Sequence, residues 1–214
     1  MNKLIVKDSN VNISNSYYEV DIKTTTLTLE ISGTVCIKDF NNNTDLDLKI
    51  IMAPDSKLLY NRYNESVNNF NLDVEMTSNS YIEFNYSLKT KTASNINLDA
   101  NISGNNNTSH INFHGLTMDE GRIYSNATSK VDENNKNNEI LENLRIIALN
   151  DTENEIIPNL LVRSDNVNAI HNTTISSLDK DYLFYLNSKG LDNASAAKLI
   201  TDGFLKSILK ESIK

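Results

Sequence analysis

The sequence predicts a mostly β fold, either a β-solenoid or a β-sandwich, followed by a short helical segment. Three observations support this prediction. Apolar and polar residues alternate through the first two thirds of the 214-residue chain, which is typical of strands that bury one face. The alternating runs recur about every 12 to 14 residues, as expected of many short strands. After Leu178 the apolar residues adopt helical spacing.

The strand-like runs follow one another with few interruptions. They span 27–37, where Gly33 keeps the phase, then 46–52, 70–76, 82–88 and 96–102, and a further run begins at Ile111. The polar, acidic segment 132–138 lacks periodicity and is expected to be a loop. Strand-like residues resume at 144–149 and 160–162. Pro158 precedes the second of these, a position compatible with the start of a strand.

The connections between the runs favour a solenoid slightly over a sandwich. No Asn-Gly turn of the kind that closes hairpins occurs, and the single Asp-Gly lies in the helical segment. The connections are instead asparagine clusters such as 41–43 and 105–107, and asparagine tolerates the left-handed backbone of a solenoid corner. We attribute the general abundance of asparagine to a compositional bias at surface positions.

Two helices are predicted after the β body. Asp179 is a candidate cap for a first helix that ends near Gly190, and Asp192 is a candidate cap for a second helix. The second helix has a wide apolar stripe, which is expected either to pack in the core or to face a partner. Its residues are Ala197, Ile200, Phe204 and Ile208, widened by Leu199, Leu205 and Leu209. The predicted division is a β domain over 1–177 and a helical domain over 178–214.

Charge and composition exclude several classes of protein. The net charge is −8 and no cluster of Lys and Arg is visible, so we expect no nucleic-acid partner. No apolar run approaches the length of about 18 residues that indicates a membrane span, so we expect no membrane partner. The first residues do not resemble a signal peptide, and Cys36 is the single cysteine. The expected location is therefore the cytoplasm.

Residues with catalytic or metal-binding chemistry are few. His110 and His114 share one face of a predicted strand about 13 Å apart, too far for one ion, and both are expected to point outward as surface residues. Cys36 lies on a polar strand face and is interpreted as incidental. No nucleophile elbow, phosphate-binding loop or paired-cysteine motif occurs. We therefore expect no catalytic machinery in this chain.

The last third of the chain carries a recognisable motif. Its residues are Pro158-Asn159-Leu160-Leu161-Val162-Arg163-Ser164-Asp165, His171-Asn172-Thr173-Thr174, and Leu178-Asp179 followed by Leu183-Phe184-Tyr185-Leu186 and Ser188-Lys189-Gly190-Leu191. This string resembles the SufB/SufD family of iron–sulfur cluster assembly proteins. The motif covers about a third of the chain, and the N-terminal half matches only in its alternation.

The resemblance implies a fold and a set of partners. The fold is a right-handed parallel β-helix followed by a small helical domain. The terminal helices would dock a SufC-like ABC ATPase. Some of their apolar residues would form that interface and the others would pack internally; these residues are Leu183, Phe184, Phe204, Leu205 and Ile208. The β-helix would pair with a SufB-like subunit or with a second copy of itself. The chain would then be a non-catalytic scaffold subunit, with ATP hydrolysis in its partner.

The resemblance also assigns a candidate cluster or iron ligand, His171. SufB-like members place a glutamate directly after this histidine, where this chain has Asn172, and a cysteine upstream of the proline, near Asn143. Both departures make the chain more SufD-like than SufB-like. We expect the chain alone to hold no cofactor, and a transient iron–sulfur cluster to form only in the complex.

Two other functions compete with the scaffold. A β-helix polysaccharide-acting enzyme would need converging acids, for which Asp73, Glu75 and Asp99 lie on outward phases. A structural solenoid, such as a surface adhesin, fits the asparagine-rich strands superficially. A secretion signal is missing for both, and the apolar helical tail does not fit an adhesin.

Overall fold

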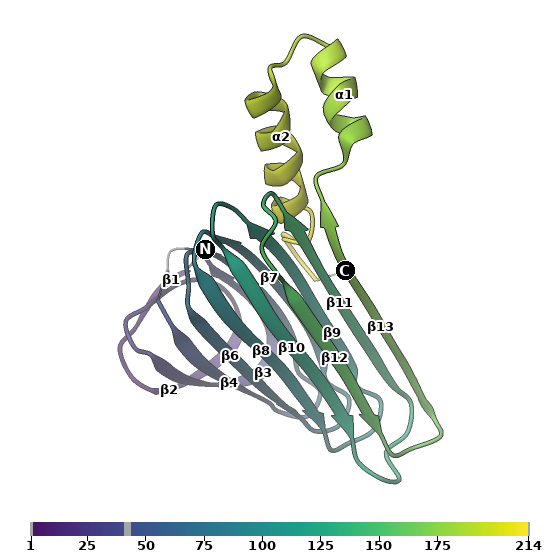
Figure 1. The fold of residues 1–214 in the computed structure, drawn as a ribbon. Coiled ribbons are helices and arrows are strands. Elements are labelled where there is room, and N and C mark those ends of the chain that lie inside the picture. Colours follow the sequence, from purple (N-terminus) through teal and green to yellow (C-terminus); the bar gives the residue numbers. More distant parts are fainter. Residues whose placement is uncertain (1, 41–43, 214) are drawn as a thin grey trace.

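The chain forms a parallel β-solenoid with a pair of helices at one end (Figure 1). A computed structural model describes residues 2–40 and 44–213. Its elements are β1 (Asn2–Val6), β2 (Asn10–Ile22), β3 (Thr26–Asp39), β4 (Leu46–Met52), β5 (Lys57–Glu65), β6 (Asn69–Met76), β7 (Tyr81–Thr90), β8 (Ala93–Ile102), β9 (Thr108–Thr117), β10 (Arg122–Val131), β11 (Asn138–Ala148), β12 (Glu155–Val162), β13 (Val167–Ser177), α1 (Lys180–Ser188) and α2 (Asn193–Lys206).

Successive strands alternate between two rows, which we call the even row (β4, β6, β8, β10, β12) and the odd row (β5, β7, β9, β11, β13). Neighbours within each row pair in parallel, which confirms the β-helix and excludes the sandwich. One rung therefore contains two strands, and the spacing recognised in the sequence is half a rung. Rung length varies: Leu46 pairs with Phe70, 24 residues later, whereas Tyr124 pairs with Glu155, 31 residues later.

Long strands close the N-terminal end of the solenoid. β3 bends so that its first half pairs with β4 and its second half with β5. Gly33 occupies the bend with φ of +66°. A Cβ atom there would lie 2.0 Å from the Asn15 side-chain oxygen, which accepts a hydrogen bond from the Thr34 amide. The bend therefore requires glycine for both backbone conformation and space.

The interior holds the apolar residues predicted from the alternation, stacked rung upon rung. Aromatic rings continue the stacking, with Phe70 and Tyr86 centroids 4.8 Å apart and Tyr86 and Phe113 centroids 5.4 Å apart. The N-terminal part of the interior also holds an ion pair between Asp39 and Arg62, both fully buried. The guanidinium lies 4.6 Å from the Phe70 ring centroid, so aromatic faces surround this buried charge.

Asparagine has a structural role that composition did not reveal. On the outer face of the even row, Asn126 donates to Asn97, Asn97 to Asn71, and Asn71 to Asp47. Similar ladders join 61, 85 and 112 on the odd row and 79, 106, 137 and 166 at the turns. Several turn asparagines also have positive φ, as expected of solenoid corners. Attributing asparagine mainly to bias was therefore wrong.

Both helices begin at the predicted caps and the first ends at the predicted glycine, whereas α2 ends at Lys206, before the predicted Ile208. Asp179 caps α1 and Asp192 caps α2, each accepting hydrogen bonds from amides of the first turn. Gly190 follows α1 with φ of +95°. Pro158 lies within β12 and not at its start, on a strand with a single neighbour, where a missing amide is tolerated. No helix in the described residues is long and apolar enough to span a membrane.

Candidate functional site

The end of α2 and the residues after it pack on the outer face of the odd row, around His114. Its ring stacks on Phe204 at a centroid distance of 4.1 Å and an angle of 7°. The Nδ1 atom lies 2.7 Å from the Phe204 carbonyl oxygen. His114 is therefore only 3% exposed, and burial lowers its pKa to about 4. The prediction that His114 is a surface residue was wrong, because α2 covers it. His110 does lie near the surface, with its Nε2 atom 3.1 Å from a Glu139 carboxylate oxygen.

Further contacts fix the chain after α2 to the same face. The Ser87 hydroxyl donates to the Leu205 carbonyl. Asn61 bonds Lys210 twice, donating to its carbonyl oxygen at 2.9 Å and accepting from its amide at 3.0 Å. Lys210 also forms an ion pair with the buried Glu83. The C-terminal segment is thereby anchored to β5, β7 and β9.

The helix pair projects beyond the strand ends (Figure 1). It carries four large side chains that the rest of the chain leaves mostly exposed, and we call this set of residues the helix patch. Its residues are Tyr182, Phe184, Tyr185 and Leu199, each more than half exposed. Phe184 is 75% exposed. Single exposed apolar residues are ordinary, but a cluster of large ones marks an interaction site.

The structure divides the five residues predicted for partner docking. Phe184 is exposed and Leu183 is half-buried. Phe204 lies against His114, and Leu205 and Ile208 are buried. The buried stripe of α2 contains the predicted Leu205 but differs in also including Ala196 and Thr201. In this arrangement Leu205 and Ile208 provide internal packing.

His171 lies on β13 at the open C-terminal end of the solenoid. Its register partner is Glu142 on β11, and register partners in parallel strands point to the same side. Glu142 points inward, because it is two residues from each of the buried Ile140 and Leu144 and therefore lies on the same face of the strand. His171 therefore occupies an interior position of the final rung, and it is exposed because β13 is the last strand of the described chain.

Glu142 is an unusual residue for a solenoid interior. It is 0% exposed, and within the described residues neither carboxylate oxygen has a hydrogen-bond partner of normal geometry. Burial raises its pKa, while the nearby Ser129 hydroxyl and the His171 ring act in the opposite direction. Burial of a carboxylate in an apolar interior is costly, and the Ser129 hydroxyl and the His171 ring offset part of this cost.

The structure also places the other residues considered for cluster chemistry. Asn143 and Asn172 are register partners and lie side by side on the outer face of β11 and β13. Cys36 is half-buried on β3. β3 lies at the N-terminal end of the solenoid and is separated from β13 by β5, β7, β9 and β11 in the strand order, so the fold does not bring the single thiol to His171.

The last two strands leave unpaired edges. β12 and β13 each have one neighbour in the strand order. Both present exposed apolar side chains, namely Ile157 and Leu161 on β12 and Ile170 and Ile175 on β13. Exposed apolar edge strands are templates for pairing with another chain.

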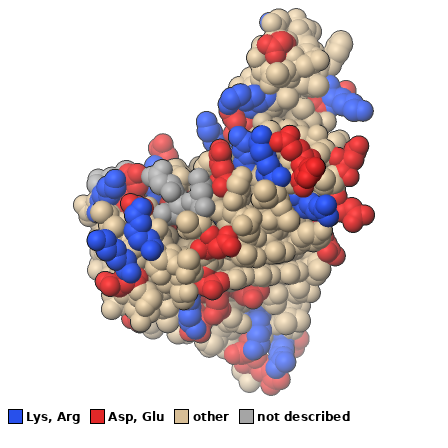
Figure 2. All heavy atoms as spheres, turned by 60° about the vertical axis from the view of Figure 1, so that its left-hand side comes forward, with Lys and Arg blue, Asp and Glu red and all other residues tan. Residues whose placement is uncertain are grey.

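The outer face of the even row carries acids that are matched by a lysine. Asp73 and Asp99 are register partners, an alignment that the sequence did not reveal. Lys49 lies 3.7 Å from Asp73 and 2.5 Å from Glu75. Figure 2 shows acidic and basic side chains interspersed across one face of the molecule. Within residues 2–40 and 44–213, no three His, Cys, Asp or Glu side chains converge as a metal-binding group.

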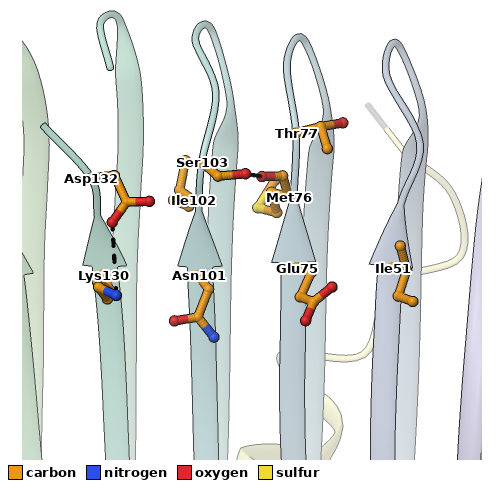
Figure 3. A pocket seen from close by; sticks show the side chains of 9 residues that line it. All are labelled: Ile51, Glu75, Met76, Thr77, Asn101, Ile102, Ser103, Lys130 and Asp132. Atoms are coloured by element: carbon orange, nitrogen blue, oxygen red, sulfur yellow. Dashed lines mark hydrogen bonds and ion pairs between the residues drawn. The ribbon is translucent and has the colours of Figure 1, made fainter. Parts of the chain in front are cut away.

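A shallow groove of about 280 Å³ lies at one edge of the even row (Figure 3). Its side chains come from successive strands and the turns that follow them. Lys130 lies 3.7 Å from Asp132, and the Ser103 hydroxyl donates to the Met76 carbonyl. Other polar groups of the groove bond residues outside it, since Glu75 accepts from Lys49 and Asn101 donates to Asp73.

Several known proteins resemble parts of this chain. A segment of 54 residues is 43% identical to an iron–sulfur cluster assembly SufBD family protein of Synechocystis sp., covering 25% of this chain and 12% of that protein. Iron–sulfur cluster assembly protein SufD of Bacillus subtilis is 26% identical over 99 residues, covering 46% and 23%. SufB of Bacillus subtilis is 30% identical over 66 residues, covering 31% and 14%.

These matches span less than a quarter of each relative's length. The family model described as "SUF system FeS cluster assembly, SufBD core domain" matches residues 58–204. That range contains both rows of the solenoid from β5 onward, both helices, His114, Glu142 and His171. The chain therefore belongs to the SufBD core-domain family of the SUF iron–sulfur cluster assembly system.

Proposed function

We propose that this chain is a non-catalytic scaffold subunit of a cytoplasmic iron–sulfur cluster assembly complex, which docks a SufC-like ABC ATPase through its helix patch. The helix patch is the observation that carries this proposal. Three of its four side chains are aromatic, and aromatic residues are enriched at the energetic centres of interfaces. The anchoring of α2 to the odd row gives the helix pair a fixed base from which to hold such a partner.

The open end of the solenoid supports pairing with a second subunit. β12 and β13 offer unpaired edges and exposed apolar side chains. Their occupant is a SufB-like subunit or a second copy of this chain. Asn143 and Asn172 occupy the two positions at which SufB-like proteins carry a cysteine and a glutamate, and they are neighbours on the outer face here. This substitution supports a SufD-like role in which the partner supplies the thiolate.

The cluster in this proposal is transient and belongs to the complex. Cys36 is the single cysteine of the chain, and iron–sulfur clusters are held mainly by several cysteine thiolates. Anaerobic reconstitution of the isolated chain is expected to give no stable visible charge-transfer band. Such a band from the chain alone would contradict the proposal.

Co-purification with the ATPase tests the docking surface. Phe184→Asp places a charge at the most exposed residue of the helix patch. It is expected to abolish association with a SufC-type ATPase, while native mass shows that subunit pairing is kept. Leu161→Asp is a matched control, since Leu161 is 53% exposed but lies on the β12 edge. It is expected to weaken pairing and to retain the ATPase. Retention of the ATPase by Phe184→Asp would refute the assignment.

A further inference from the structure

The last turn of α2 and the residues that follow it form a segment across the outer face of the odd row, which we call the strap (residues 204–210). The face beneath the strap is mostly polar and yet buried. Five of its residues on β5 and β7 lie on the outward side of their strands and are 2% exposed or less, namely Leu59, Asn61, Glu83, Asn85 and Ser87. Buried polar groups require hydrogen-bond partners, and the strap supplies several of them.

The strap contacts this face as a bound peptide contacts its receptor. Asn61 donates to the Lys210 carbonyl oxygen and accepts from the Lys210 amide, so one side chain recognises the main chain of the strap. The buried Glu83 carboxylate pairs with the Lys210 ammonium group. The Ser87 hydroxyl donates to the carbonyl oxygen of Leu205, whose side chain is itself buried. The face therefore recognises one apolar side chain, one lysine and the backbone between them.

The strap belongs to a helical unit (residues 178–213) that is separate from the solenoid core. Leu178 and Asp179 are the only residues between β13 and α1, and α1 packs on α2. In the part of the chain that the structure describes, the apolar core cluster contains no residue of this unit. The strap can therefore leave its face without opening the core, and a short connection between two elements is a typical hinge for the exchange of a unit between copies.

We propose that two copies of this chain exchange their helical units, so that the strap of each copy lies on the odd row of the other. Each copy carries both the face and the strap. The contacts of Asn61, Glu83 and Ser87 therefore re-form unchanged between copies related by a two-fold axis. This pairing is distinct from pairing through the edges of β12 and β13, and it rests on the strap contacts and not on the proposed function.

Reversal of the Glu83–Lys210 ion pair tests the exchange in chains that also carry Leu161→Asp, which weakens pairing through the β12 edge. Glu83→Lys and Lys210→Glu each bring like charges together within one chain, whereas in an equimolar mixture opposite charges meet between chains. Native mass is expected to show a heterodimer in the mixture. An affinity tag on one variant is expected to retain roughly tenfold more of the other variant than of an untagged copy of itself. Equal retention would overturn the proposal.

Two controls use the same assay. The double variant with Glu83→Lys and Lys210→Glu restores the ion pair within one chain, so it is expected to be retained no more than a chain with the wild-type pair. Lys49 and Glu75 form an ion pair between β4 and β6, inside the solenoid, where exchange would require unfolding. A mixture of Lys49→Glu and Glu75→Lys is expected to show no added retention, and added retention there would contradict exchange through the strap.

Cross-linking provides a test that does not depend on a charge reversal at a buried position. Asn61→Cys and Lys210→Cys are placed in separate chains that also carry Cys36→Ser, and a short bis-maleimide is added to the mixture. A covalent product with one copy of each chain is expected on a denaturing gel, and its absence would refute the exchange. Phe184→Asp leaves the strap intact and is expected to keep this product, so failure of ATPase docking and failure of exchange are separate results.

Discussion

Acidification is expected to destabilise the docking of α2 through a single residue, His114. Its pKa is lowered from 6.5 to about 4, first by burial, with a smaller contribution from the positive charge of Arg145. Because its pKa is lower in the folded state than in the unfolded state, His114 binds a proton more readily when the chain is unfolded. The stability it confers is therefore fully present above pH 6.5 and is lost as the pH falls from 6.5 towards 4.

The size of the effect follows from these two pKa values. Proton linkage gives a loss of about 2 kcal/mol between pH 7 and pH 5, and about 3 kcal/mol by pH 4. Urea unfolding followed by circular dichroism at several pH values measures this loss. Carboxylates that titrate below pH 5 contribute in every variant, so a reference without the imidazole is required.

His114→Gln supplies that reference, since a glutamine amide can still donate to the Phe204 carbonyl. The difference in unfolding free energy between the wild-type chain and His114→Gln is expected to shrink by about 2 kcal/mol from pH 7 to pH 5. His110→Ala is a second control and is expected to follow the wild-type curve in shape. Parallel curves for wild type and His114→Gln across this window would refute the burial-based explanation.

Three further substitutions test the solenoid itself by urea unfolding at pH 7.5. Gly33→Ala is expected to destabilise the chain by about 1–3 kcal/mol, because a Cβ atom meets Asn15 in a left-handed backbone; an unchanged midpoint would contradict the bend geometry. Arg62→Met leaves the Asp39 carboxylate buried in the interior and is expected to cost about 3–5 kcal/mol, a loss that should diminish in the double variant with Asp39→Leu. Asn97→Ala interrupts the ladder between Asn71 and Asn126 and is expected to cost about 1–2 kcal/mol, whereas a neutral effect would show that the ladder is only a surface decoration.

The strands were predictable from sequence because one physical pattern dominates them. Strands such as β4 and β8 bury alternate residues in a narrow interior, so Leu46 to Met52 or Ile96 to Ile102 can be recognised without knowledge of their neighbours. The helix caps were equally local, since Asp179 and Asp192 bond amides within their own first turns. Features that depend on a few neighbouring residues were therefore accessible.

Features that depend on the pairing register of the strands could not be predicted from the sequence. The asparagine ladders join residues 24 to 31 positions apart, and this offset changes from rung to rung as the turns lengthen. No fixed repeat in the sequence reveals them. His114 is covered by Phe204, 90 residues later, and the inward direction of His171 emerges only from its pairing with Glu142. The resemblance identified His171, but the carboxylate beside it required the structure.

β13 joins the two surfaces on which the proposed function depends. It carries His171 and leads through Leu178 directly into α1, whose exposed side chains form most of the helix patch. β13 is held by a single ladder of hydrogen bonds to β11, and segments with few neighbours open at the lowest free-energy cost. In the proposed complex, a partner that binds α1 would therefore act on β13, whereas α2 is held on the odd row at His114 and the segment after it at Asn61. Motion of α1 would then reach the open end of the solenoid without unfolding its interior.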